Sequence, residues 1–285
     1  MARIVTVINF KGGVGKTTTA IELCCSLAKH HGRRTLLVDL DPQASATFYV
    51  MEQSAWFKWK ELRGSTYNLF EHRDISFPIR NAIVTDVLQN KAPVLGFDLL
   101  PSTPDLIELD LGLTDFISYN ILQCYLDQIR DDYDYIICDC PPNFNPVTKN
   151  SLWASDAYII PTVPDFLSTY GIGLLQRSVN KLINPNAQQL QLKGPALGGI
   201  ILTRIKARVL LHTSYCEQVR HDYPGNVFKH VISDSIIVAE APNNRLPVST
   251  ILKPKAHEAD LQEQFKALAG EFISRIRHIR SRTGP

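Results

Sequence analysis

Eight consecutive residues near the N-terminus, "KGGVGKTT", have the types and spacing that are needed to hold the phosphates of a nucleotide. Glycines at this spacing let backbone N–H groups turn toward phosphate oxygens, where larger side chains would obstruct them. Lys16 would reach the β- and γ-phosphates, and the hydroxyl of Thr17 would bind Mg²⁺. We therefore predict a nucleotide-binding loop made of Lys11, Gly12, Gly13, Val14, Gly15, Lys16, Thr17 and Thr18.

The loop departs from the usual pattern G-x-x-x-x-G-K-[ST] at its first position. Phe10 occupies the place of the first glycine, and a second lysine, Lys11, follows it. On the residues alone, Lys11 is an additional contact to phosphate at the entrance of the loop.

Aspartates follow two other apolar runs. "LLVDLDPQASAT" contains Asp39 and Asp41, and "YDYIICDCPP" contains Asp139. An aspartate at the end of an apolar strand is the usual carboxylate that holds Mg²⁺, directly or through water. Aspartates also form turns at strand ends. Three of them at the edge that carries the phosphate loop favour the metal site, with Thr17, Asp39 and Asp139 as its candidate ligands.

The elements that must position these residues alternate along the chain. Continuous β-branched and apolar runs are typical of parallel strands buried on both faces. We predict strands at 3–9, 34–40, 97–102, 133–139, 157–163, 196–205 and 227–232. We predict helices at 17–30, with Gly32 as its C-cap, over most of 105–130, and at about 256–281. This order predicts one α/β domain over residues 1–285, with a doubly wound, mostly parallel sheet and helices on both faces.

The composition is that of a globular protein, with 45% hydrophobic and 20% charged residues. The formal net charge of +2 indicates that any nucleic-acid-binding surface must be local. Six cysteines lie in apolar runs without zinc-ligand spacing, which favours buried, reduced thiols. The sequence has no run of about 18 apolar residues, so we expect a cytoplasmic protein.

Six segments together resemble the ParA/MinD family of deviant Walker P-loop ATPases, and the ParA branch more closely. They are "KGGVGKTTTA", "LLVDLDPQASAT", "FDLLPSTPDL", "YDYIICDCPP", "SDAYIIPTVPDF" and "VAEAP". The resemblance implies hydrolysis of ATP with Mg²⁺ as cofactor. It implies that Lys11 reaches the nucleotide of a partner subunit in an ATP-sandwich dimer and that Asp41 orients the attacking water. It makes Lys11, Lys16 and Asp41 the catalytic candidates, and it suggests adenine contacts from Arg204 and Pro242.

The resemblance also implies partners. ParA-like ATPases bind nucleoid DNA without sequence preference as ATP dimers, and a small adaptor of ParB or analogous type stimulates hydrolysis. The cargo could be a plasmid, a chromosome or a protein organelle such as a carboxysome, so the expected location is the nucleoid in the cytoplasm.

One segment departs from the family where many relatives carry DNA-binding arginines. Here the segment reads "SDSIIVAEAP", with Asp234 and Ile237 at these places. Cations elsewhere could replace them, because DNA phosphates require only local positive charge. The candidates are Arg204, Lys206 and Arg208, together with Arg275, Arg277, Arg280 and Arg282 of the C-terminal segment.

Two rival interpretations remain at this point. A MinD-like ATPase would use an amphipathic C-terminal helix to lie on a membrane, which we do not expect here because the apolar stripe of that helix suits burial against a sheet. The stripe is Leu261, Phe265, Leu268, Phe272, Ile276 and Ile279. A relative of the nitrogenase iron protein would need cluster-ligating cysteines, and Cys138 and Cys140 lack the spacing for a shared cluster. Lys149 remains either a second trans contact or an ordinary helix residue.

Overall fold

A computed structural model describes residues 1–88, 96–109, 120–190, 194–206 and 209–279. Its centre is a six-stranded sheet in the order β3-β2-β4-β1-β5-β6, and all of its strand pairs are parallel. The strands are β1 (Arg3–Val7), β2 (Thr35–Asp39), β3 (Asp98–Leu100), β4 (Tyr135–Asp139), β5 (Ala157–Thr162) and β6 (Ala196–Leu202). This confirms the predicted doubly wound α/β fold.

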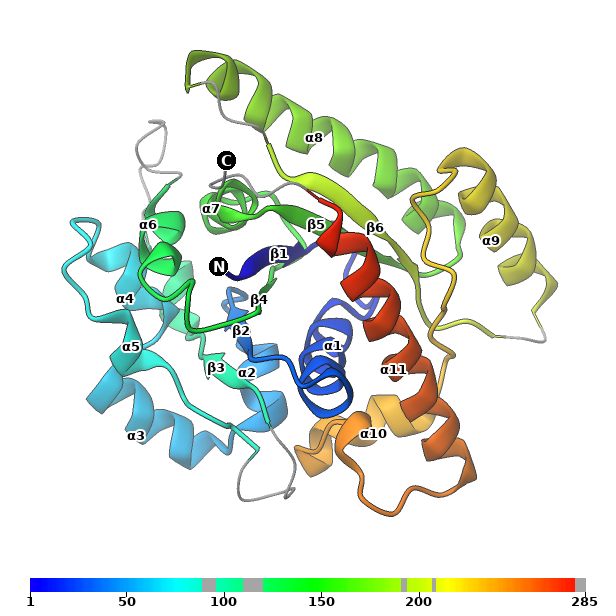
Figure 1. Ribbon diagram of the computed structural model, residues 1–285, viewed down its shortest axis with the longest axis horizontal. Coiled ribbons are helices and arrows are strands. Elements are labelled where there is room, and N and C mark those ends of the chain that lie inside the picture. Colours follow the sequence, from blue (N-terminus) through cyan, green and yellow to red (C-terminus); the bar gives the residue numbers. More distant parts are fainter. Residues whose placement is uncertain (89–95, 110–119, 191–193, 207–208, 280–285) are drawn as a thin grey trace.

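Helices cover both faces of the sheet (Figure 1). They are α1 (Lys16–His31), α2 (Ser45–Val50), α3 (Gln53–Arg63), α4 (Thr66–Glu71), α5 (Ile79–Ala82), α6 (Ile121–Asp127), α7 (Pro146–Ala154), α8 (Phe166–Leu190), α9 (Leu210–Asp222), α10 (Ile236–Asn244) and α11 (Ala256–Arg277). Within the described ranges, two short 3₁₀ helices lie between these elements, at Pro104–Ile107 and Val248–Thr250. Helix α1 ends, as predicted, at Gly32, which adopts the left-handed conformation with φ of 60°.

One face of the sheet is packed against α1 and α11. Leu261, Phe265, Leu268, Phe272 and Ile276 of α11 are almost fully buried in this core. The apolar stripe of the C-terminal helix therefore stabilises the sheet, as its spacing predicted, and is not a surface for a membrane. No helix in the described ranges is long and apolar enough to span a bilayer.

The other face has two cores. One core lies under α4, α5 and α6, and the other lies between β5, β6 and helices α8 and α9. Four of the six cysteines are buried and all six are free thiols, as expected. Burial raises the pKa of the Cys24 and Cys138 thiols, which keeps them protonated and inert.

Two of the predicted elements are wrong. Residues 227–232 form no strand: Val227 makes only an isolated bridge to Ile200 of β6. The backbones of Phe228 and Ile200 are still hydrogen-bonded, and the ring of Phe228 packs on Gly199, where any Cβ would lie 2.5 Å from the ring. The predicted helix over 105–130 is, in its described part, a 3₁₀ helix at Pro104–Ile107 followed by the short α6 at Ile121–Asp127. Residues 110–119 lie outside the described residues.

Candidate nucleotide site

The phosphate loop lies between the carboxyl end of β1 and the first turn of α1. Gly13 and Gly15 have φ of 72° and 81°, the left-handed region in which a side chain would be strained. Gly15 caps α1, which begins at Lys16, so the loop ends at the positive end of the helix dipole. The structure thus confirms the strand–loop–helix context that the sequence predicted.

Two residues from the segment after β6 donate hydrogen bonds to backbone carbonyls of the phosphate loop. The hydroxyl of Thr203 donates a hydrogen bond to the carbonyl of Val14, 2.8 Å away. Arg204 Nη1 donates to the carbonyl of Gly13 at 3.0 Å. These two bonds fix the backbone of the loop at Gly13 and Val14.

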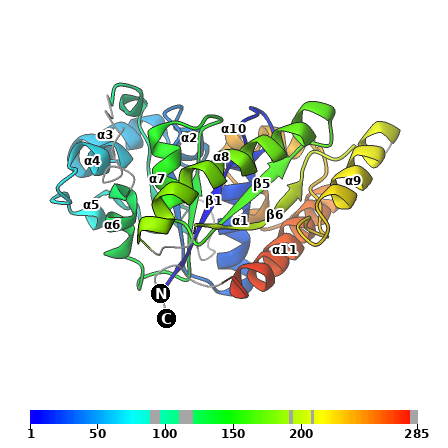
Figure 2. The same ribbon diagram turned by 90° about the horizontal axis from the view of Figure 1, so that it is seen from above.

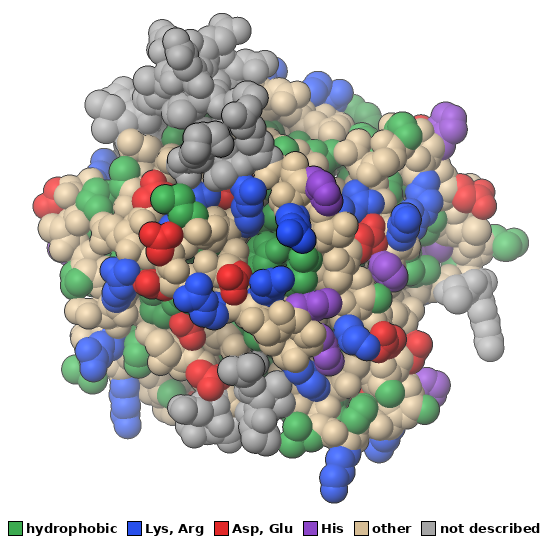
Figure 3. Space-filling view, in the orientation of Figure 1, with side chains coloured by type: hydrophobic (Ala, Val, Ile, Leu, Met, Phe, Trp, Pro, Cys, Tyr) green, Lys and Arg blue, Asp and Glu red, His purple; other side chains and the backbone are tan. Residues whose placement is uncertain are grey.

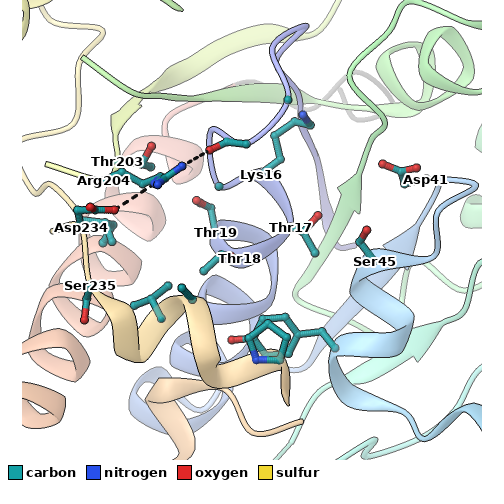
Figure 4. A pocket seen from close by; sticks show the side chains of 18 of the residues that line it. Lys16, Thr17, Thr18, Thr19, Asp41, Ser45, Thr203, Arg204, Asp234 and Ser235 are labelled. Carbon is teal, nitrogen blue, oxygen red and sulfur yellow. Dashed lines mark hydrogen bonds and ion pairs between the residues drawn. The ribbon is translucent and has the colours of Figure 1, made fainter. Parts of the chain in front are cut away.

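Arg204 also makes an ion pair with Asp234, with Nε 3.1 Å from the carboxylate (Figure 4). Lys206 lies 3.7 Å from the other oxygen of Asp234. The acid at a position where relatives often carry arginine therefore pairs with two of the cations that the sequence suggested for DNA. Arg204 lines the cavity, but its guanidinium is occupied by Gly13 and Asp234.

Lys16 is 7% exposed, and its Nζ donates to the carbonyl of Lys11 at 3.1 Å. Burial lowers the pKa of this ammonium, while Asp139 and Asp41 act in the opposite direction. Lys16, Thr17 and Asp41 border the same open space in Figure 4. The lysine is thus already directed at the place where a phosphate would lie.

Asp39 and Asp139, which are register partners on β2 and β4, differ in their surroundings. The carboxylate of Asp39 accepts hydrogen bonds from the N–H and hydroxyl of Thr47, at 2.8 and 2.7 Å, and from the N–H of Asp41. Burial raises the pKa of Asp39 to about 7 despite these bonds. Asp39 therefore shapes the loop that follows β2.

Asp139 is fully buried, and neither of its oxygens has a hydrogen-bond partner in the described structure. Burial, and then the nearby Asp39, raise the pKa of this carboxyl group well above its ordinary value, although the Thr17 side chain and the Lys16 ammonium lie close enough to act in the opposite direction. A buried carboxylate without partners is costly unless a cation compensates it. The site therefore fits Mg²⁺, which is typically bound by one or two protein groups plus phosphate oxygens and water. The described residues contain no group of three or more acidic, histidine or cysteine side chains that could hold a metal alone.

Asp41 follows β2 directly and is 8% exposed at the cavity wall. One of its carboxylate oxygens accepts from the N–H of Gln43 at 2.9 Å, and its carbonyl accepts from Ser102 at 2.7 Å. These bonds fix the side chain of Asp41 close to the phosphate loop.

The loop opens into a cavity of about 640 Å³. Its apolar wall combines Phe48 and Tyr49 of α2 with Val238, Ala239 and Pro242 of α10. Pro242 and Arg204, the two residues suggested for adenine contacts, both line this cavity. The α2 side of the wall was not predicted, because nothing in the spacing of Phe48 and Tyr49 shows that α2 faces α10.

Lys11 has a partner that the sequence did not reveal. Its Nζ lies 2.9 and 2.7 Å from the two carboxylate oxygens of Asp165, just before α8. The same carboxylate accepts from the N–H and hydroxyl of Ser168 at 2.8 and 3.1 Å. Burial alone would raise the pKa of Asp165, but the hydrogen bonds from Lys11 and Ser168 outweigh it and lower the pKa.

The arginines of the final helix are not equivalent. Arg275 donates to Glu271, to the carbonyl of Gly225 and to the carbonyl of Val227, and it stacks 4.6 Å from the ring of Phe228. Arg277 is exposed at the end of α11. Arg208 and Arg280 lie outside the described residues. Arg275 is thus held within the protein, while Arg277 faces solvent.

A glycine-rich loop of this kind, at the carboxyl edge of a parallel sheet with helices on both faces, defines a P-loop nucleotide-binding protein. A family model described as an AAA domain matches residues 2–192. The Soj sporulation initiation inhibitor protein of Bacillus subtilis is 30% identical over 262 residues, which cover 92% of this chain and 95% of that protein. The ParA chromosome partitioning protein of Caulobacter vibrioides is 32% identical over 289 aligned positions, covering 96% and 95%. This chain therefore belongs to the ParA/Soj family of partitioning ATPases.

The fold comparison agrees with this family. Cobyrinic acid a,c-diamide synthase of Mycobacterium smegmatis, solved with bound ADP and magnesium, superposes with a TM-score of 0.74 at 25% identity. The match covers 100% of both chains. The whole described sheet and its flanking helices thus follow one known P-loop architecture.

The unpartnered carboxylate of Asp139 leads to a first prediction. When folding raises the pKa of a carboxyl group, its ionised form is disfavoured in the folded protein. The free energy of unfolding therefore falls as the pH rises from the pKa of the unfolded chain to the pKa of the folded protein. Without nucleotide, Asp139→Asn should therefore be more stable than the wild type at pH 8, by on the order of 1–3 kcal/mol. The difference should shrink toward pH 5, because lowering the pH favours the protonated form of a carboxyl group whose pKa is raised. Urea unfolding at both pH values measures it, and a variant less stable than the wild type at pH 8 contradicts the assignment.

Proposed function

We propose that this protein hydrolyses ATP with Mg²⁺ at the cavity beside the phosphate loop. The observation that carries the proposal is the buried carboxyl group of Asp139 at the end of β4, close to Lys16 of a glycine-rich loop that leads into the first turn of α1. Backbone N–H groups of the loop would bind the phosphates, and Lys16 would neutralise their charge. Thr17 and Asp139 would hold the metal, whose chemistry is to neutralise charge between the outer phosphates.

Asp41 would orient the attacking water. Its side chain is fixed by Gln43 and lies at the cavity wall near Lys16, so it can accept a hydrogen bond from a water beside the terminal phosphate. A residue that positions water without acting as a strong base is consistent with slow turnover until another protein acts on the complex.

The proposed role in partitioning is based on the membership of this chain in the ParA/Soj family. We propose that two ATP-bound copies form a dimer, bind DNA without sequence preference and release it when a ParB-type adaptor stimulates hydrolysis. Lys11 would enter the nucleotide site of the second copy, which requires it to leave Asp165. Because Ser168 still satisfies the carboxylate of Asp165, the departure of Lys11 leaves no buried unpaired acid.

The DNA-binding surface would use cations other than those paired within the fold. On the face shown in Figure 3, acidic side chains lie among the basic ones, so the surface is no uninterrupted basic patch. Arg204 and Lys206 are paired with Asp234, and Arg275 is held by Glu271. Arg277 is the described arginine of the final helix that is left for DNA phosphates, and Arg280 would follow it in the sequence.

A DNA-retention assay tests this proposal. The wild type with ATP and Mg²⁺ should retain DNA at low salt, and its affinity should fall steeply as salt rises, because binding releases counterions. Arg277→Glu should reduce the slope of log affinity against log salt by about one unit or more without changing sequence preference. Lys253→Glu, a charge change at another exposed position, is the matched control. If ATP is hydrolysed but no DNA is retained at low salt, the DNA-binding part of the proposal falls.

A further inference from the structure

Three arginines from distant segments of the chain converge on Tyr135, at the edge of the sheet where the strands begin. Arg3 is the first residue of β1 and the register partner of Tyr135 on β4, so the two side chains lie on the same face of the sheet. Arg33 lies just before β2, which pairs with β4 on its other side. Arg277 ends α11, whose Phe272 contacts the ring of Tyr135 edge-on, with 5.4 Å between the ring centroids. We call this group the amino-edge cluster (Arg3, Arg33, Arg277 and Tyr135).

The positive charges of the amino-edge cluster act on the hydroxyl group of Tyr135. Burial raises the pKa of Tyr135. Arg33, Arg3 and Arg277 act on this pKa in the opposite direction, which requires them to lie close to the hydroxyl group. Within the described ranges, none of the three arginines makes an ion pair with an acidic residue. In Figure 3, which looks onto this edge, Lys and Arg side chains lie near the middle of the face.

Acidic residues at this edge have other partners. Asp134 also raises the pKa of Tyr135, but its carboxylate accepts a hydrogen bond from the N–H of Arg34 at 2.8 Å. Asp131 lies 3.6 Å from the ammonium group of Met1. The cluster therefore concentrates positive charge that these two acids do not neutralise.

Arg3 gives a second, independent observation. Its Nη1 is buried and has no hydrogen-bond acceptor within the described residues. A guanidinium nitrogen that is shielded from water without an acceptor costs free energy, which a bound anion would offset. Tyr135 is also buried, and its hydroxyl group has no partner in the part of the chain that the structure describes. The amino-edge cluster thus has several hydrogen-bond donors for a negatively charged ligand.

We propose that the amino-edge cluster binds a phosphate group. A guanidinium group presents N–H donors in a planar fork that matches two phosphate oxygens, and it keeps its charge at physiological pH. Three such groups and a phenol hydroxyl can therefore satisfy several oxygens of one phosphate or pyrophosphate. The phosphate would belong to a free phosphorylated solute or to the backbone of a nucleic acid, because the same donors serve both.

The amino-edge cluster is separate from the nucleotide site. β1 is five residues long, from Arg3 to Val7, and the phosphate loop follows its other end, so the two sites are about 16 Å apart along the strand. Figure 2 shows β1 rising from the N-terminus, with the end of α11 on the same side of the molecule as the N-terminus. No residue of the cluster lines the nucleotide cavity. The inference goes beyond the proposed function, because this site needs neither ATP nor a second copy of the chain.

Calorimetric titration with inorganic pyrophosphate, in EDTA and without nucleotide, tests the site on the full chain. The wild type should bind pyrophosphate at the phosphate loop and again at the cluster, and ADP should displace only the first. The test variant is Arg3→Gln with Arg33→Gln, which should lower the affinity of the second site at least about thirtyfold. The matched control, Arg63→Gln with Arg177→Gln, removes the same charge from two other exposed positions and should keep both sites. Arg277 is left unchanged, so this test is independent of the DNA assay on Arg277→Glu.

Retention of a short DNA duplex without ATP distinguishes the two sources of the phosphate. If the nucleic-acid backbone is the ligand, the wild type and the control should retain the duplex at low salt. The test variant should then reduce the slope of log affinity against log salt by about two units. Pyrophosphate binding at the second site without DNA retention would instead identify a free phosphorylated solute.

The affinity for ADP should change less than about twofold in both variants, which also shows that they are folded. The inference is overturned if the wild type binds pyrophosphate only where ADP displaces it and retains no DNA without ATP. A test variant that binds both probes like the control overturns it as well. Both results leave the proposed function in place, whereas a protein that binds pyrophosphate at the cluster but does not hydrolyse ATP would contradict only the proposed function.

Discussion

Replacing Lys11 by alanine is expected to abolish ATP-dependent dimerisation while ATP still binds. In its own chain Lys11 contacts Asp165 through its side chain and not the phosphate-facing side of the loop. The loss of one charge-assisted contact to phosphate across the dimer should weaken dimerisation at least about thirtyfold. Light scattering with and without ATP and Mg²⁺ gives the result, and a fluorescent ATP analogue gives the affinity of the monomer.

Two further variants serve as controls for the interpretation of Lys11→Ala. Lys16→Ala should weaken ATP binding itself by about a hundredfold, because Lys16 is the buried cation of the same chain's cavity. Asp165→Asn keeps an oxygen that can accept from Ser168 but releases Lys11 from its ion pair. It should therefore dimerise at least as tightly as the wild type. A Lys11→Ala protein that dimerises normally would show that this lysine has no role in trans.

Replacing Asp41 by alanine is expected to reduce ATP hydrolysis by about a hundredfold or more while leaving ATP-dependent dimerisation and DNA retention intact. Asp41 lies at the cavity wall but contributes none of the N–H groups of the phosphate loop, so nucleotide binding does not depend on it. The loss of a group that positions the nucleophile typically costs a factor of this size. Phosphate release measured over hours, together with sedimentation velocity, separates chemistry from assembly.

The control for Asp41 is the neighbouring acid of the same loop. Asp39→Asn keeps one acceptor oxygen but replaces the other with an NH₂ group, which cannot accept from the N–H groups of Thr47 or Asp41. It should lower stability and activity together because it disturbs the loop as a whole. Thermal unfolding distinguishes this mixed effect from the purely catalytic effect at Asp41. Hydrolysis by Asp41→Ala at the wild-type rate would remove the water-positioning role.

Local sequence determined the phosphate loop, the three strand-end aspartates and the α/β order. These features are local because a parallel strand buried on both faces needs a continuous apolar run, and a turn around phosphate needs glycine. The burial of the α11 stripe could also be predicted from the sequence, because a helix with one apolar face is stabilised when that face packs against a sheet. The family resemblance, which the comparisons confirm, came from these same local segments.

Only the tertiary structure decided which charged groups are paired. Lys11 and Asp165 are 154 residues apart, Arg204 bonds to a loop 191 residues earlier, and Arg275 bonds to backbone carbonyls about fifty residues away. No spacing rule predicts such partners, because the connections between strands bring them together. For this reason the arginines of the final helix could be identified from the sequence, but their roles could not. Arg275 donates hydrogen bonds within the protein, whereas Arg277 faces solvent. The sequence also could not show which apolar face of α8 is exposed. The pattern of a helix indicates which faces are apolar, but only packing against the sheet determines which of them is buried.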